Sequence, residues 1–272
     1  MNTVLKWSFR SILILLALIL LYLGYVTFKF NQSFTPMPRN FAVSTNVDLD
    51  EGQRLARITG CYGGCHAADA SGQDFFGVYA SNLTKIVHDY SDAQLEHAIR
   101  QGIRPDGTSL QMMPSAMYQH LSNDDLSHII GFLRTLPQSD KPLKGDVAMM
   151  GMAPYLGYTF YGDLIMSALY SNTVTPPKSR PTASSQQGEY MTLIACTECH
   201  GQNLQGFGDM IPSLSMVKAY SLEEFKTLLS TGRALGDRDV GVMSIVAKSR
   251  FTHMTEAEMA TVYEHIKSQD FL

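Results

Sequence analysis

Two short motifs, each a pair of cysteines followed directly by a histidine, constrain this 272-residue chain more than any other feature. The first reads CYGGCH, from Cys61 to His66, and the second reads CTECH, from Cys196 to His200. Together they use all four cysteines of the chain. A framework made only of disulfides would not need a histidine after each pair. The pattern therefore indicates two separate sites in which sulfur and imidazole act together.

The second motif has the spacing Cys-x-x-Cys-His, which is the attachment signature of a c-type haem. In that chemistry two thiols, here Cys196 and Cys199, form thioethers with the porphyrin, and the adjoining His200 ligates the iron. Two alternatives stay open from the residues alone. One is a zinc ion held by the four cysteines, which would leave both histidines unused. The other is a thioredoxin-like redox pair, which expects a βαβ setting that this sequence lacks.

The first motif departs from this spacing because three residues, Tyr-Gly-Gly, separate Cys61 from Cys65. Consecutive glycines can adopt backbone angles closed to other residues. We therefore expect the extra residue to form a bulge, with Cys61, Cys65 and His66 still binding a haem. The alternative is a degenerate site that has lost its haem.

The sequence around the two motifs is duplicated. Tyr90 and Tyr220 differ by 130 positions, and so do Gly102 and Gly232. Segments with helical hydrophobic periodicity precede and follow each motif in the same order. This internal repeat predicts a mainly α fold with two tandem copies of one small helical domain.

Several of the expected helices carry recognisable end signals. At helix starts we expect Ser91 as an N-cap, and Ser122 with Asp125 and Thr255 with Glu258 as capping boxes. At helix ends we expect Gly102 just past the helix that Ser91 begins, and Pro137 after the helix that Ser122 begins.

A haem iron with one histidine ligand has a second open face, which electron-transfer cytochromes commonly close with methionine. Met113 and Met243 also differ by 130 positions, and each lies shortly before the last expected helix of its copy. The predicted iron ligands are therefore His66, Met113, His200 and Met243. The alternatives are that these methionines only pack in the core, or that His120 and His253 complete bis-histidine ligation.

The N-terminal segment carries no charge from Ser11 to Phe28. As a helix it would span roughly 27 Å, about the thickness of a bilayer's hydrocarbon core. Lys6 and Arg10 precede it, which favours a cytoplasmic N-terminus. A cleaved signal peptide is the alternative, but the expected small-residue cleavage site is missing. We predict a single-span anchor in a bacterial inner membrane, with the remaining chain in the periplasm.

The segment between the two copies is apolar from 147 to 170, with Asp163 as its one charge. A second membrane span is conceivable, but Pro154 and three glycines argue against it. We expect this connector to wrap the two domains together or to rest on the membrane surface or a partner. The predicted divisions are an anchor at 1–30, a tether at 31–47, domain one at 48–140, a connector and Pro/Ser-rich linker at 141–187, and domain two at 188–272.

The stretches CYGGCH, SNLTKIVHDYSDAQLEHAIRQG and GEYMTLIACTECHGQNLQGFG together resemble membrane-anchored dihaem class I cytochromes c. They are similar to the cytochrome c subunits of bacterial periplasmic dehydrogenases. The resemblance implies two covalently bound haem c groups and, in each domain, first and last helices that cross. It also implies redox protein partners: dehydrogenase, cytochrome or oxidase subunits.

The function expected from this resemblance is electron transfer from a periplasmic dehydrogenase or respiratory complex to a downstream carrier or oxidase, without an enzymatic activity of its own. A dihaem enzyme, such as a peroxidase or a thiosulfate-oxidising cytochrome, is the alternative. The paired methionines and the absence of a spare cysteine ligand argue against it. The net charge of -4 gives no basis for a nucleic-acid partner.

Overall fold

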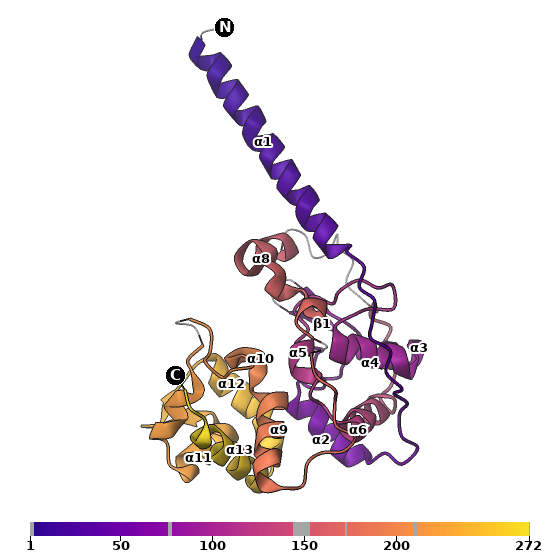
Figure 1. Cartoon of the computed structure of the whole chain (residues 1–272), viewed down its shortest axis with the longest axis vertical. Coiled ribbons are helices and arrows are strands. Elements are labelled where there is room, and N and C mark those ends of the chain that lie inside the picture. Colours follow the sequence, from indigo (N-terminus) through magenta and orange to yellow (C-terminus); the bar gives the residue numbers. More distant parts are fainter. Residues whose placement is uncertain (1–2, 76–77, 144–152, 172, 209–210, 272) are drawn as a thin grey trace.

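The computed structural model describes residues 3–75, 78–143, 153–171, 173–208 and 211–271. Helix α1 (Thr3–Phe30) extends away from the rest of the molecule (Figure 1). Within the described residues, Lys6–Phe30 is the single stretch long and apolar enough to cross a membrane. The predicted N-terminal apolar helix is therefore confirmed, and a helix of this kind serves as a membrane span or as a signal sequence.

The first helical half follows the tether and is built around two crossing helices, α2 (Leu49–Ile58) and α6 (Asn123–Leu133), which pack against each other. The other elements of this half are β1 (Gln73–Phe75), β2 (Val78–Ala80), α3 (Leu83–Asp89), α4 (Asp92–Gln101) and α5 (Ser115–Tyr118). The two strands form an antiparallel hairpin. The mainly helical prediction is thus confirmed for this half.

The second half is built in the same way around α9 (Ser184–Ala195) and α13 (Glu256–Ser268). Its other elements are α10 (Thr197–His200), η3 (Leu214–Ala219), α11 (Leu222–Thr231), β3 (Arg233–Ala234), β4 (Arg238–Asp239), α12 (Val242–Ser249) and η4 (Phe251–His253). Because α9 begins at Ser184, the boundary predicted at 188 falls inside a helix.

A glycine permits the helix crossing in each half. A Cβ on Gly52 of α2 would lie 2.7 Å from the carbonyl carbon of His128 in α6, and closer still to its oxygen. A Cβ on Gly188 of α9 would lie 2.8 Å from the carbonyl carbon of Thr261 in α13. Backbone meets backbone at both crossings, so no larger residue fits without moving a helix.

The predicted helix ends are confirmed, with one difference at α6. Ser91 and Thr255 form complete capping boxes, and Gly102 ends α4 with a left-handed φ of 67°. Ser122 caps α6 by accepting a hydrogen bond from the backbone N–H of Asp125 at 3.0 Å. The backbone N–H of Ser122 donates instead to the hydroxyl of Tyr190. The shorter aspartate therefore leaves the second half of the box to a tyrosine from α9.

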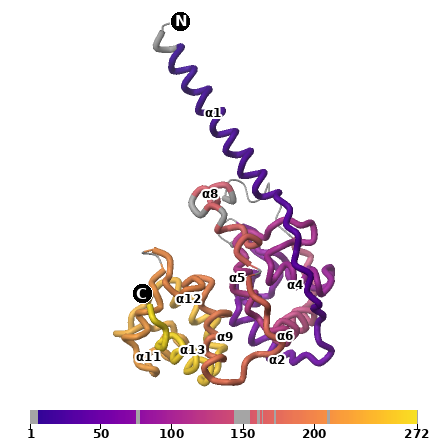
Figure 2. Tube along the Cα trace, in the orientation of Figure 1, coloured from indigo at the N-terminus to yellow at the C-terminus, as the bar shows by residue number. Residues whose placement is uncertain are grey.

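The connector folds against the base of α1 as α8 (Ala153–Tyr161), followed by the short turns η1 (Gly162–Ile165) and η2 (Ser167–Leu169) (Figure 2). The hydroxyls of Tyr22 and Thr159 are 2.7 Å apart, and Tyr158 packs edge-on against Tyr25 and Phe30. At nine residues α8 is too short to span a bilayer. The start of the apolar segment, 147–152, lies outside the described residues.

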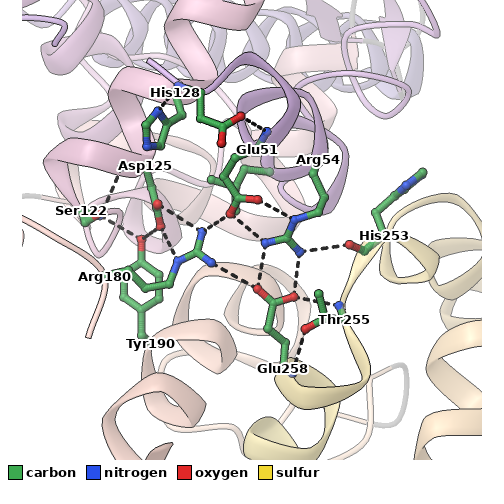
Figure 3. Close-up of polar contacts among 12 residues, drawn as sticks. Glu51, Arg54, Ser122, Asp125, His128, Arg180, Tyr190, His253, Thr255 and Glu258 are labelled. Carbon is green, nitrogen blue, oxygen red and sulfur yellow. Dashed lines mark hydrogen bonds and ion pairs between the residues drawn. The ribbon is translucent and has the colours of Figure 1, made fainter. Parts of the chain in front are cut away.

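The two halves are held together by a continuous apolar core and by a charged cluster at its edge. Arg180, from the Pro/Ser-rich linker, reaches three carboxylates that belong to different elements (Figure 3). It donates to Asp125 at 3.0 Å, to Glu51 at 2.6 Å and to Glu258 at 3.2 Å. Arg54 also donates hydrogen bonds to Glu51 and Glu258, at 2.7 Å each, and so forms a second bridge between these two carboxylates. We call these five residues the interdomain charge cluster.

Candidate functional site

The first cysteine motif lies directly after α2, in a segment of turns rather than a helix. Cys61 is buried and Cys65 is partly buried. Gly63 has a left-handed φ of 77°, which side chains disfavour. Gly64 has no such angle, but a Cβ there would lie 2.7 Å from the carbonyl oxygen of Gly60. The extra residue is therefore accommodated in two ways. Gly63 adopts a backbone angle that other residues disfavour, and Gly64 has no side chain to collide with Gly60.

The second motif is helical and follows α9 almost without a break. Its short helix α10 ends at His200, whose backbone N–H donates to the carbonyl of Cys196 at 3.0 Å. Cys196 and Cys199 are both partly buried. The two motifs therefore reach similar positions in their halves with different local backbones.

The two motif histidines have equivalent environments. Nδ1 of His66 lies 2.8 Å from the carbonyl oxygen of Ser81, and Nδ1 of His200 lies 2.9 Å from that of Pro212. A carbonyl only accepts, so each Nδ1 carries the proton and each Nε2 keeps a free lone pair. Burial lowers the pKa of both imidazoles, against the effect of these hydrogen bonds. Both rings are thus held neutral and oriented, as an iron ligand must be.

All four cysteines are free thiols. Burial raises the pKa of Cys65 and of Cys196 to about 12, and it raises the pKa of Cys61 and Cys199 as well. Within the described residues no three His, Cys, Asp or Glu side chains are grouped closely enough to hold a metal ion. The cysteines are therefore not gathered into a zinc site, and the zinc alternative has no support.

The methionines separate into buried, partly buried and exposed positions. Met117 and Met254 are core residues. Met112 is 44% exposed and has a left-handed φ of 59°. Met113 and Met243 are partly buried and pack against the core, Met243 from the first turn of α12. Their predicted role as iron ligands stays a prediction.

The connector braces the loop that carries Met113. The hydroxyl of Ser167 donates to the carbonyl of Met113 at 2.5 Å, and its backbone N–H donates to Leu110 at 3.0 Å. The N–H of Met112 donates to the carbonyl of Ile165 at 2.9 Å. Nothing in the sequence of the connector signals this contact, because it consists mainly of backbone hydrogen bonds. The same connector also packs on α1, so one segment joins the N-terminal helix to this loop.

The two histidines considered for bis-histidine ligation lie close to the contact between the halves. Nε2 of His120 lies 3.0 Å from the side-chain oxygen of Gln202, which follows the second motif. His253 is in η4, and its carbonyl accepts from Arg54 at 3.1 Å. The contact across the interface therefore involves the side chain of His120 but only the backbone of His253.

Arg100 offers a further test of whether the first half suits a haem. The residue is fully buried, and its Nε and Nη1 have no hydrogen-bond partner among the described residues. Glu96 lies 3.7 Å from Nη1, and burial lowers the pKa of Arg100 to about 10, so the group stays charged at neutral pH. Spare buried donors of this kind suit a carboxylate such as a haem propionate.

The crossing helices, the paired thiols and the oriented imidazole define the first half as a small helical domain suited to a c-type haem. A family model described as Cytochrome c matches residues 49–137. The match supports a cytochrome c domain in this segment, and domains of that family bind haem c covalently and transfer electrons. The match covers the first half of the structure and stops before the connector. No curated protein matches the chain.

Proposed function

We propose that the chain is a membrane-anchored dihaem c-type cytochrome with one haem in each helical half. Cys61, Cys65 and His66 hold the first haem, and Cys196, Cys199 and His200 hold the second. Met113 and Met243 complete the two iron sites. Each haem, when bound, takes up and releases one electron at its iron. The protein supplies ligation, burial and a fixed geometry.

The observation that carries the second site is its equivalence to the matched cytochrome c domain. Both halves have a glycine at the helix crossing, and both orient a motif histidine through a backbone carbonyl. The second half also has the Cys-x-x-Cys-His spacing that is the attachment signature of a c-type haem. We assign the same role to the second half on this basis.

The proposed cellular setting follows from α1. Its apolar length suits a bilayer, and the basic residues before it favour a cytoplasmic N-terminus. Both haem sites then lie in the periplasm of a bacterium. The partners are redox proteins: a periplasmic dehydrogenase or respiratory complex as donor, and a carrier or oxidase subunit as acceptor.

The haem count tests the proposal directly. We expect two haems per chain by the pyridine haemochrome assay, and haem staining that survives denaturing electrophoresis. A chain with both Cys61 and Cys65 changed to alanine should lose one of the two haems, and so should a chain with Cys196 and Cys199 changed. Retention of both haems in the first variant would mean that the CYGGCH segment does not attach one.

The methionine ligands distinguish an electron carrier from a dihaem enzyme, which needs an open iron face. We expect the ferric protein to show the weak long-wavelength band of methionine ligation, and Met113→Ala and Met243→Ala each to lose about half of it. Each variant should also open one iron to cyanide. Met117→Leu is the matched control, since Met117 is a core residue, and should keep the full band. A high-spin haem in the unaltered protein would favour the enzyme alternative.

A further inference from the structure

We propose that Arg250 and Glu198 form a charged bridge between the two haem-attachment segments and set the reduction potentials of the haems. This inference rests on the proposed function, because it requires a haem at each motif. It concerns a pair of residues that takes part in neither attachment nor iron ligation.

Arg250 follows α12 in the second half, yet its side chain reaches the first motif. Its Nε donates to the carbonyl oxygen of Ile58 at 2.7 Å, three residues before Cys61. A Cβ on Gly60 would lie only 3.5 Å from the Arg250 guanidinium carbon. The guanidinium therefore lies against the backbone that leads into the CYGGCH segment.

The same guanidinium also contacts the second motif. Its Nη1 donates to a carboxylate oxygen of Glu198 at 2.6 Å, and Glu198 lies between Cys196 and Cys199. Nearby, α5, which follows the Met113 loop, packs against α10, and the side chain of Gln202 donates to the carbonyl of Ala116 at 3.2 Å. The two attachment segments therefore face one interface, with Arg250 between them.

The pair is shielded from solvent, so its charges act over a longer range than surface charges do. The side chain of Arg250 is 8% exposed and that of Glu198 is 22% exposed. Nη2 of Arg250 is buried and has no hydrogen-bond partner among the described residues. Burial disfavours the guanidinium charge, but Glu198 outweighs this effect and the pKa of Arg250 is raised. The guanidinium therefore stays charged at neutral pH.

A fixed positive charge near an iron favours the reduced state, because reduction removes one positive charge from the metal. A fixed negative charge has the opposite effect. Arg250 should raise the potentials of the haems beside it, and Glu198 should lower them. The two substitutions must therefore shift the potentials in opposite directions, which loss of folding or of packing would not produce.

The test is a redox titration of the haem-loaded full chain, followed by its visible absorbance. At the ambient potential where the parent protein is half reduced, Arg250→Gln should lower the ratio of reduced to oxidised haem about three- to tenfold. Glu198→Gln should raise that ratio. Arg250→Lys, which keeps the charge, should restore most of the parent value. Glu198→Gln leaves the side-chain volume almost unchanged. The direction of its shift therefore tests the inference even where Arg250→Gln folds poorly.

Arg54→Gln is the matched control. Arg54 also joins the two halves, but it hydrogen-bonds Glu51, Glu258 and His253 rather than either attachment segment. It should lower stability and leave the titration unchanged. Two outcomes would overturn this inference and leave the proposed function standing. One is an equal shift of the reduction potentials in Arg54→Gln and Arg250→Gln, and the other is a shift of the same sign in Arg250→Gln and Glu198→Gln. A parent protein with one haem would overturn the proposed function, and the inference with it.

Discussion

Changing Gly52 to alanine is expected to lower the free energy of unfolding by about 3 kcal/mol, and Gly188→Ala should do the same. In an exposed helix this change would stabilise by up to about 1 kcal/mol. Here the new methyl group would meet the carbonyl of His128 or Thr261 on the crossing helix. Backbone cannot rotate away as a flexible side chain can, so the helices must separate and lose buried contacts.

Thermal unfolding followed by circular dichroism would measure this effect. Gly157→Ala is the matched control: Gly157 also lies in a helix, α8, but the nearest atom to its Cβ would be a terminal methyl of Ile165 at an ordinary 3.8 Å. We expect the control to unfold at or above the parent midpoint. If Gly52→Ala unfolded at the same temperature as the control, the close crossing of α2 and α6 would be wrong.

Replacing Arg180 with methionine should cost about 3–5 kcal/mol, because it leaves the buried carboxylate of Asp125 without its cation. Glu258 keeps its ion pair with Arg54. Asp125 and Glu258 are only 5% and 4% exposed in their side chains, and both lose a hydrogen-bonding partner in this variant. Denaturant unfolding would measure the loss. Lys226→Met is the control: Lys226 pairs with Glu223 and Glu256, whose side chains are 81% and 88% exposed, and no measurable change is expected.

The same cluster predicts a loss of stability in acid. Burial raises the pKa of Glu51 and Glu258, but hydrogen bonds and charges from Arg54 and Arg180 outweigh it, so both values lie below the ordinary 4.5. A carboxylate with a depressed folded-state pKa stabilises the fold fully above its unfolded value and loses this contribution as pH falls through the folded value. The difference between the parent and Arg180→Met should therefore be largest above pH 4.5 and shrink below it.

The parts of the fold that the sequence predicts well are those with local causes. The apolar run of α1 and the caps at Ser91, Gly102 and Thr255 depend on neighbouring residues alone. The domain boundary predicted at 188 lies four residues inside α9, because Ser184 belongs to a Pro/Ser-rich stretch that resembles a linker. The two crossing glycines carry no local signal, since a glycine inside a helix reads only as a weak helix former.

In the candidate sites too, features with local causes could be predicted and contacts between distant residues could not. Motif spacing predicts the cysteines and histidines as site residues, and the register of the internal repeat predicts the two methionines. The partners of these residues could not be predicted: Ser167 supports Met113 from the connector, and Arg250 lies 189 positions from Cys61. Contacts at such separations depend on how the halves pack, which no local pattern encodes.

The linker that carries Arg180 has a consequence for the kinetics of the molecule. Asn123 and Asp124 donate their backbone N–H groups to the carbonyls of Pro177 and Lys178, and Arg180 is fixed in the interdomain charge cluster. The segment is therefore a strap along the first half, not a free tether on which the second half swings. In the proposed dihaem protein, electron exchange between the two haems would then take place at a separation fixed when the protein folds. Its rate should be independent of solvent viscosity, whereas each exchange with an outside partner is limited by diffusion and docking.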